Sequence, residues 1–471
     1  MKRFFAVICV TILLLLFVGC ENNAIKPTES VTDSTNDVTV ASTEPATKAE
    51  NTGYTFTKIT LDKNSKELSE RFDEIGIVEA AVDCKESIKF IDGTEGIVYL
   101  IRDTGALDSG VFFKYFLAVE TADKYIIEEY GPFCGTTIYV NDLDGDKADE
   151  ITLCSNTGGT ALTKIGRVYK VENDALCEIF RSSDTDNWDT GFEGVTKDNF
   201  MFEVTNKFTG YSTSFQLDTK RYIDTYYDEK GNVIEEGKLW LLSFKDFYTD
   251  DKDNDGVYEI YAEQHACLVG KNEGLGYTKC TYKFNNKTDN FEVVDAELIS
   301  PYNMDDKYLV QQGEYYSAYK YDMSYFYKIT AKDGTVRNVR SDLIKLPDFN
   351  MLSENLLEVT GQAGTGISTN WAFYYDADTD KLSQNYNYVY DCNTELVAYC
   401  QYDGNKHSII VQDMFDRTKY YNKFNVFSSP INTTVTEPIR SVEFSDDGKS
   451  IKVVYLAGDE KVETEEIFEL Y

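Results

Sequence analysis

The feature that most constrains this chain is a string of alternate aspartates that occurs twice with the same flanking residues. The first copy runs from Asp142 to Glu150 and the second from Asp251 to Glu259, and both follow the frame D-x-D-x-D-x-x-x-E. In each copy a Tyr stands three residues before the frame and an Ile follows its glutamate. Because the agreement extends beyond the aspartates, we interpret the copies as a repeated element of the fold and call them the first and the second acidic loop.

The spacing of the acidic residues is typical of a loop that binds a hard divalent cation. Ca²⁺ takes six to eight oxygen ligands at about 2.3–2.6 Å, and alternate residues of a tight loop can turn their carboxylates toward one centre. The seventh position of the frame would add its backbone carbonyl and the ninth its carboxylate. We therefore predict two Ca²⁺ sites with these ligands: Asp142, Asp144, Asp146, Ala148 and Glu150 in the first loop, and Asp251, Asp253, Asp255, Val257 and Glu259 in the second.

Other interpretations of the aspartates follow from the sequence. Asp, Asn and Gly are the usual turn residues, so the loops could be solvated β-turns without a metal. An EF-hand would need Glu at the twelfth position, where the two copies have Leu153 and Ala262. A third string of alternate aspartates, residues 376–380, lacks the frame because Gln384 stands at its ninth position.

The two loops resemble the calcium loops of FG-GAP repeats, as in integrin α-chain β-propellers, and of the related bacterial VCBS repeats. The resemblance implies that each loop joins two strands of a propeller blade and holds Ca²⁺. Similar strand-turn-strand patterns follow both copies, starting with Tyr-Lys at residues 169–170 and 282–283. Glutamate replaces the common aspartate of the family at position nine, and the first loop lacks the glycine that the second has at position six, Gly256.

The remaining chain predicts an all-β fold. From residue 54 onward, short runs rich in Val, Ile, Tyr and Phe alternate with turns of Asp, Asn and Gly. Asp-Gly turns predict hairpins over residues 325–336 and 442–453. We expect a β-propeller of about seven blades, two with Asp-rich calcium loops and a degenerate one near residues 195–245. The alternative is a shorter propeller over residues 54–300, followed by a separate β-rich domain over residues 301–471.

Two further local features concern a helix and the cysteines. The best helix candidate is Ser65 to Ile75, where apolar residues recur at helical spacing. Eight cysteines follow Cys20, and they could form disulfides, with Cys392 and Cys400 able to close a hairpin, or stay as free thiols.

The N-terminus resembles the signal and lipobox of a bacterial lipoprotein. Lys2 and Arg3 precede an apolar run that is too short to span a bilayer comfortably, and the run ends at Gly19-Cys20. The resemblance implies a signal peptide over residues 1–19, a lipid on Cys20 and a location outside the cytoplasm, anchored to the membrane. The alternative is an ordinary secretory signal with an incidental cysteine. Residues 20–53 are rich in Thr, Ser and Glu and contain no aromatic residue, which predicts a disordered tether.

Charge and motif content narrow the function. The chain carries 81 acidic and 46 basic side chains, so it would repel phosphate backbones and nucleic acid is not an expected partner. With 2 histidines and no motif typical of a hydrolase or nucleotide-binding enzyme, the sequence singles out no catalytic residue. Trp371 could form a platform for stacking a sugar, or it could pack in the core.

We therefore expect a surface lipoprotein whose calcium-stabilised propeller binds a protein or a glycan of the cell envelope. One alternative is a carbohydrate-active enzyme, a glycosidase or a polysaccharide lyase, on the same scaffold. The other is a structural or sensory accessory lipoprotein.

Overall fold

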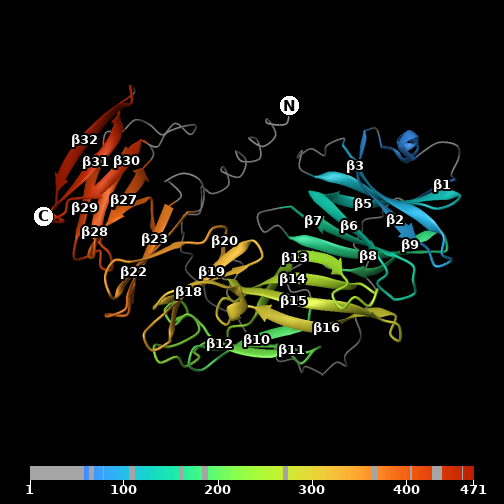
Figure 1. Cartoon of the computed structure of the whole chain (residues 1–471), viewed down its shortest axis with the longest axis horizontal. Coiled ribbons are helices and arrows are strands. Elements are labelled where there is room, and N and C mark those ends of the chain that lie inside the picture. Colours follow the sequence, from blue (N-terminus) through green and yellow to red (C-terminus); the bar gives the residue numbers. More distant parts are fainter. Residues whose placement is uncertain are drawn as a thin grey trace, which may run out of the picture. The chain divides into compact units, whose positions relative to one another are not determined.

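Antiparallel β-sheets form nearly all the regular structure, which confirms the prediction of an all-β protein (Figure 1). The computed structural model describes residues 58–62, 68–77, 79–104, 112–158, 163–182, 189–268, 274–362, 370–403, 406–426, 438–458 and 460–470. The signal peptide, Cys20 and the tether predicted over residues 1–53 lie outside these ranges. No helix within the described ranges has the length and apolarity to cross a membrane.

The first sheet has five strands in the order β1-β5-β4-β3-β2. The strands are β1 (Lys58–Asp62), β2 (Ala80–Lys89), β3 (Glu95–Asp103), β4 (Phe113–Glu120) and β5 (Lys124–Phe133). Between β1 and β2, the described part of the predicted α-helix forms two short 3₁₀ helices, η1 (Leu68–Glu70) and η2 (Phe72–Ile75). Gly76 ends the second one with a positive φ of 79°, a conformation that glycine adopts without steric cost.

The two acidic loops belong to one sheet of eight strands. Its path runs β16-β15-β14-β13-β8-β7-β6, and β9 pairs with β8. The strands are β6 (Gly135–Asn141), β7 (Glu150–Asn156), β8 (Lys164–Glu172), β9 (Ala175–Arg181), β13 (Trp240–Asp250), β14 (Glu259–Cys267), β15 (Gly274–Asn285) and β16 (Asn290–Ile299). The sheet therefore consists of two four-stranded meanders, one for each loop.

A narrow seam joins the two meanders. Strands β8 and β13 pair only between Lys164 and Phe244. Close packing holds the seam as well, because a Cβ on Gly166 would lie 2.5 Å from the ring of Phe247. A larger residue at position 166 would push the two meanders apart.

The segment between the meanders forms a smaller sheet than a four-stranded blade. Its strands are β10 (Phe192–Lys197), β11 (Met201–Asn206) and β12 (Ser212–Gln216). Residues 227–233, within the expected degenerate blade, form a tight turn with an isolated antiparallel bridge between Tyr227 and Val233.

The C-terminal part of the chain forms four further antiparallel sheets. The first contains β17 (Leu309–Gln312), β18 (Tyr316–Tyr321), β19 (Ser324–Thr330) and β20 (Val336–Leu343), after the 3₁₀ helix η4 (Asp306–Tyr308). The second contains β21 (Asp348–Met351), β22 (Leu356–Gln362), β23 (Asn370–Asp376), β24 (Lys381–Leu382) and β25 (Tyr386–Asn387). The last two contain β26 (Val389–Cys392), β27 (Leu396–Asp403), β28 (Lys406–Asp413) and β29 (Tyr421–Val426), and β30 (Ile439–Phe444), β31 (Ser450–Ala457) and β32 (Val462–Glu469). Both predicted Asp-Gly hairpins are present, as β19–β20 and β30–β31.

The described strands close into no barrel or propeller, so the propeller of about seven blades stays a prediction. The hydrophobic core crosses residue 300, where the alternative placed a domain boundary. Val336 and Val339 pack in the same cluster as Phe215 and Leu298. All eight cysteines of the described chain are free thiols, so the pairing of Cys392 with Cys400 is absent.

Candidate metal sites

Each acidic loop connects two neighbouring antiparallel strands. The first joins β6 to β7 and the second joins β13 to β14. The strand register is the same in both, since Asn141 pairs with Glu150 and Asp250 pairs with Glu259. The ninth residue of each frame is therefore the first residue of the second strand, and the strand ladder holds it beside the start of the loop.

The structure brings the three aspartates of each loop together. Asp142, Asp144 and Asp146 each offer a carboxylate oxygen within 4.8 Å of the others, and the aspartates of the second loop, Asp251, Asp253 and Asp255, do the same. The structure therefore places the three aspartates of each predicted site close together, and their role as metal ligands stays a prediction. Clustered carboxylate oxygens suit a hard cation such as Ca²⁺. The identity of the cation stays a prediction.

Backbone N–H groups fix one side of the first cluster. Both oxygens of Asp142 accept N–H groups, from Gly145 at 2.7 Å and from Lys147 at 2.9 Å. Oδ1 of Asp144 accepts the N–H of Asp146, and Oδ1 of Asp146 accepts the N–H of Ala148. The Oδ2 atoms of Asp144 and Asp146 remain for a cation.

The second loop repeats this pattern. Both oxygens of Asp251 accept N–H groups, from Asp255 and from Gly256 at 3.1 Å each. Oδ1 of Asp253 accepts the N–H of Asp255, and Oδ1 of Asp255 accepts that of Val257. The Oδ2 atoms of Asp253 and Asp255 are again left for a cation.

The two loops share a backbone conformation although their glycines stand at different positions. Position four has a positive φ in both loops, with Gly145 at 77° and Asn254 at 59°. Position six also has a positive φ in both, with Lys147 at 76° and Gly256 at 87°. Lys147 thus adopts the conformation that Gly256 has in the second loop, at a steric cost that glycine does not have.

A lysine that sequence reasoning missed contacts each cluster. In the first loop Lys170 Nζ donates to Oδ2 of Asp144 and, at 2.7 Å, to Oδ2 of Asp146. In the second loop Lys283 Nζ lies 3.4 Å from Oδ2 of Asp255 and 3.7 Å from Oδ2 of Asp253. Hydrogen bonds and charge from the carboxylates raise the pKa of Lys170 although its partial burial acts in the opposite direction.

The position of both lysines follows from the strand register. Lys170 follows Tyr169, which pairs with Ile151, and Lys283 follows Tyr282, which pairs with Ile260. The repeated Tyr-Lys pair was therefore the sequence signal for these residues. The strand register, which the sequence alone does not reveal, places the lysine of each pair beside a cluster.

The ninth-position glutamates differ in their surroundings. Glu150 is 0% exposed, and its Oε2 accepts the N–H of Leu143 at 2.8 Å. Its Oε1 has no hydrogen bond and lies 3.6 Å from Lys170 Nζ. Burial raises the pKa of Glu150 to about 8. In contrast, Oε1 of Glu259 accepts a hydrogen bond from Lys283 at 2.8 Å.

The two loops are in direct contact. The N–H of Tyr258 in the second loop donates to the carbonyl oxygen of Asp142 in the first at 2.8 Å. The side chain of Asn286 donates to the carbonyl oxygen of Asp144 at 3.3 Å. Loops that lie 109 positions apart in the sequence, from 142 to 251, are therefore neighbours in the fold.

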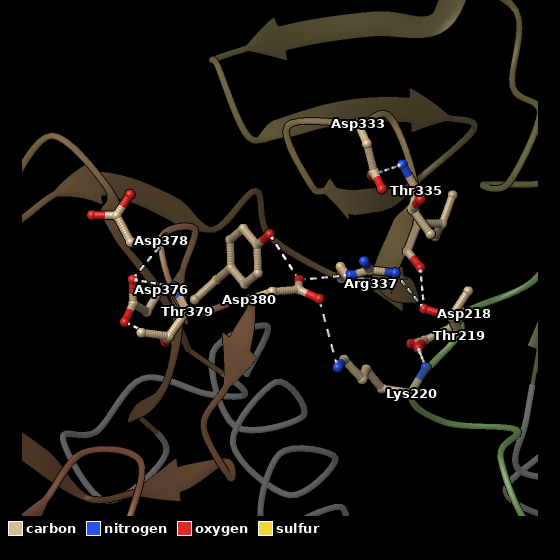
Figure 2. A network of polar contacts seen from close by, with 12 residues as sticks. Asp218, Thr219, Lys220, Asp333, Thr335, Arg337, Asp376, Asp378, Thr379 and Asp380 are labelled. Atoms are coloured by element: carbon tan, nitrogen blue, oxygen red, sulfur yellow. Dashed lines mark hydrogen bonds and ion pairs between the residues drawn. The ribbon is translucent and has the colours of Figure 1, made fainter. Parts of the chain in front are cut away.

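The third string of aspartates does not form a similar cluster. Figure 2 shows Asp376 turned toward Thr379 and Asp380 turned toward Arg337 and Lys220. The partners are Thr379 for Asp376, Lys332 and Asn355 for Asp378, and Arg337, Tyr375 and Lys220 for Asp380. The exclusion of this string from the repeat agrees with the structure, in which Asp376 bonds within its own turn and Asp378 and Asp380 reach the neighbouring sheet of β17–β20.

Trp371 lies in the core and not on the surface. It is 8% exposed and packs in a cluster with Val359 and Phe373. The guanidinium of Arg340 lies 4.8 Å from its ring centre, and a Cβ on Gly361 would meet the ring at 2.2 Å. These contacts favour core packing over a platform for a sugar.

The fold and the two clusters define the chain as an all-β protein with paired acidic loops. A family profile and a curated relative each match part of it. The profile of the YybI C-terminal domain matches residues 190–299, which include the second loop. The uncharacterized protein YybI of Bacillus subtilis strain 168 is 23% identical over 154 residues, which are 32% of this chain. The match spans 58% of the length of that relative.

Several solved structures also align with much of the chain. A eukaryotic initiation factor aligns with a TM-score of 0.18 and 10% sequence identity, over 82% of this chain and 93% of that chain. The GH93 α-L-arabinofuranosidase of Fusarium graminearum aligns with a TM-score of 0.20 and 8% sequence identity, over 82% of this chain and 92% of that chain. Sqt1 of Saccharomyces cerevisiae aligns with a TM-score of 0.16 and 8% sequence identity, over 74% of this chain and 98% of that chain. At TM-scores this low, the alignments establish no shared fold.

Proposed function

We propose that this protein is a calcium-binding lipoprotein of the cell envelope. In this proposal the signal peptide directs the chain out of the cytoplasm, a lipid on Cys20 anchors it to the membrane, and residues 20–53 hold the β-sheet region away from the surface. The two meanders act as FG-GAP or VCBS-type blades. Their module binds a protein or a glycan of the envelope.

One observation carries the calcium part of the proposal. Both loops leave Oδ2 of the second and third aspartates and Oε1 of the glutamate without a backbone donor. They differ at the other glutamate oxygen, which accepts the N–H of Leu143 in the first loop and the hydroxyl of Tyr261 in the second. A solvated turn has no reason to repeat this arrangement in two loops that differ in sequence at five of nine positions. A site for one cation in each loop explains the repetition.

Calcium titration of the full chain tests this part. Millimolar CaCl₂ should raise the Tm relative to chelator by mass action, and calorimetry should find two Ca²⁺ per chain. The double variant Asp144→Ala, Asp253→Ala should lose the rise. A matched control is Asp376→Ala with Asp378→Ala, which removes two carboxylates from the third string and should keep the rise. An unchanged Tm of the parent chain in chelator and in calcium would refute the calcium sites.

The anchor is tested separately. Cys20→Ser should release the protein from membranes of the producing cell into the soluble fraction. Retention of the variant in the membrane fraction after a high-salt wash would contradict a lipid on Cys20.

A further inference from the structure

The position that a cation would take in each loop already contains a positive charge. In the first loop Lys170 Nζ contacts Oδ2 of Asp144 and of Asp146 and lies 3.6 Å from Oε1 of Glu150. These are the three oxygens that no backbone N–H group holds. The ammonium group therefore occupies the space between the oxygens that face the centre of the cluster.

Lys283 has the same position in the second loop. Its Nζ lies 2.8 Å from Oε1 of Glu259, 3.4 Å from Oδ2 of Asp255 and 3.7 Å from Oδ2 of Asp253. The lysine is thus matched in both copies to the same three atoms of the frame. Such agreement is not expected of two independent surface ion pairs.

An ammonium group and Ca²⁺ cannot share these oxygens. A calcium ion would lie about 2.3–2.6 Å from each of them, in the volume that Nζ now fills. A calcium ion and an ammonium group bound to the same oxygens would also lie close enough to repel each other strongly. Binding of the metal therefore requires that the lysine leaves.

We propose that Lys170 and Lys283 are intramolecular competitors of Ca²⁺, which hold the loops in the metal-free protein and determine the metal affinity of each loop. This inference rests on the proposed function, in which the loops bind Ca²⁺. Glu150 gives it independent support. The carboxylate is fully buried, and its Oε1 faces the cluster without a hydrogen bond even with the lysine present.

The surroundings give both lysines a place to go. A hollow of about 320 Å³ lies beside the first loop, and Asp146 and Lys170 both line it. The side chain of Lys283 is 36% exposed and can turn into solvent. The long, flexible stem of lysine permits such a movement without a change of the backbone.

The chain offers matched controls for the competition. Lys147 belongs to the first loop and is exposed, and Lys252 belongs to the second, where its ammonium lies over the ring of Tyr261. Replacing either one with Met removes one positive charge near the same cluster, as replacement of Lys170 or Lys283 does. Only the latter two variants also empty the cation position.

Calorimetric titration of the full chain with CaCl₂ tests the proposal. Lys170→Met and Lys283→Met should each tighten one of the two sites by about tenfold or more, because the metal no longer has to displace an ion pair worth at least ~1.4 kcal/mol. Lys147→Met and Lys252→Met should change the same affinity by less than about threefold. Equal effects of the two kinds of variant would overturn the competition and leave the calcium sites intact. Absence of Ca²⁺ binding to the parent chain and to all variants would overturn both.

A second measurement uses the parent chain and does not depend on a variant that folds. Acetic anhydride labels free amines, and mass spectrometry reads the extent at each lysine. Calcium should increase the labelling of Lys170 and Lys283 several-fold relative to Lys147 and Lys252. Labelling that calcium leaves unchanged at saturating concentration would show that the lysines stay in place, which contradicts the proposal.

Discussion

The first and the second acidic loop share their frame, their strand register and their lysine, but they differ in burial. In the first loop Asp144 is 8% exposed and Glu150 is 0% exposed. In the second loop the side chain of Asp253 is 58% exposed. The comparison shows that the sequence frame determines the geometry of the loop, whereas the neighbouring elements determine how unfavourable it is to bury the charged carboxylates of the loop.

The flanking contacts explain the difference. The first loop lies between β2 and the second loop, since Asp149 exchanges two hydrogen bonds with the backbone of Lys89 and Tyr258 donates to Asp142. Burial raises the pKa of Asp142, although two N–H groups act against it. In the second loop the N–H of Val257 lowers the pKa of the exposed Asp255. The first loop therefore carries more unfavourable charge when no metal is bound.

The largest expected difference between the two loops is the change in stability when their ninth-position glutamates are replaced, in chelator at pH 7. Glu150→Gln should stabilise the chain by about 1–3 kcal/mol, because the buried carboxyl no longer has to be desolvated or protonated on folding. Glu259→Gln should instead destabilise it by about 1 kcal/mol, since it weakens the ion pair with Lys283. Urea unfolding of the two variants and the parent chain measures both effects. Shifts of the same sign would remove the electrostatic difference between the loops.

The pH dependence of the first variant provides the control. The pKa of Glu150 is raised from an ordinary value of 4.5 to about 8, so between these values the folded chain holds a proton that the unfolded chain releases. The contribution of this group to the free energy of unfolding of the parent chain is therefore fully present below about pH 4.5, and it is lost as the pH rises through about 8. The advantage of Glu150→Gln should vanish near pH 4.5 and grow toward pH 8. A constant advantage across this range would contradict burial as the cause.

A smaller effect concerns the sixth position of each frame. Gly256→Ala should destabilise the chain by about 1 kcal/mol, because alanine must adopt a φ of 87° there. Lys147→Ala should change stability by less than about 0.5 kcal/mol, since a residue with a Cβ already has this conformation in the first loop. Thermal unfolding in chelator measures both variants. Equal losses would show that the two loops do not share the backbone conformation described.

Local spacing made the acidic clusters predictable from the sequence. Alternate aspartates in a tight loop lie close together regardless of the structure around the loop. The grouping of Asp142 with Asp144 and of Asp251 with Asp253 therefore followed from the frame. The lysines could not be found in this way, because the ladder that brings Lys170 to Asp144 links residues 26 positions apart. The burial of Glu150 depends on contacts even more distant in the chain.

The fold was predictable to a similar extent. Alternating runs of Val, Ile, Tyr and Phe predicted strands, and strands formed, including the Asp-Gly hairpin before β20. The assignment of strands to sheets depends on packing between distant segments, and the expected blade near residues 195–245 is a sheet of three strands followed by turns. The predicted helix at Ser65 to Ile75 has 3₁₀ geometry where it is described, because so short a segment gains little from an α-helical ladder of its own.

The seam between β8 and β13 gives the molecule a mechanical weak point. Along most of the sheet a pulling force would have to break long ladders of hydrogen bonds, but between β8 and β13 it meets one paired backbone position, the ion pair of Lys164 with Asp246 and the packing of Phe247. Tension across the seam would meet fewer backbone hydrogen bonds than tension between the strands of either meander. Separation of the two meanders would break the bond from Tyr258 to Asp142 and so uncouple the two acidic loops.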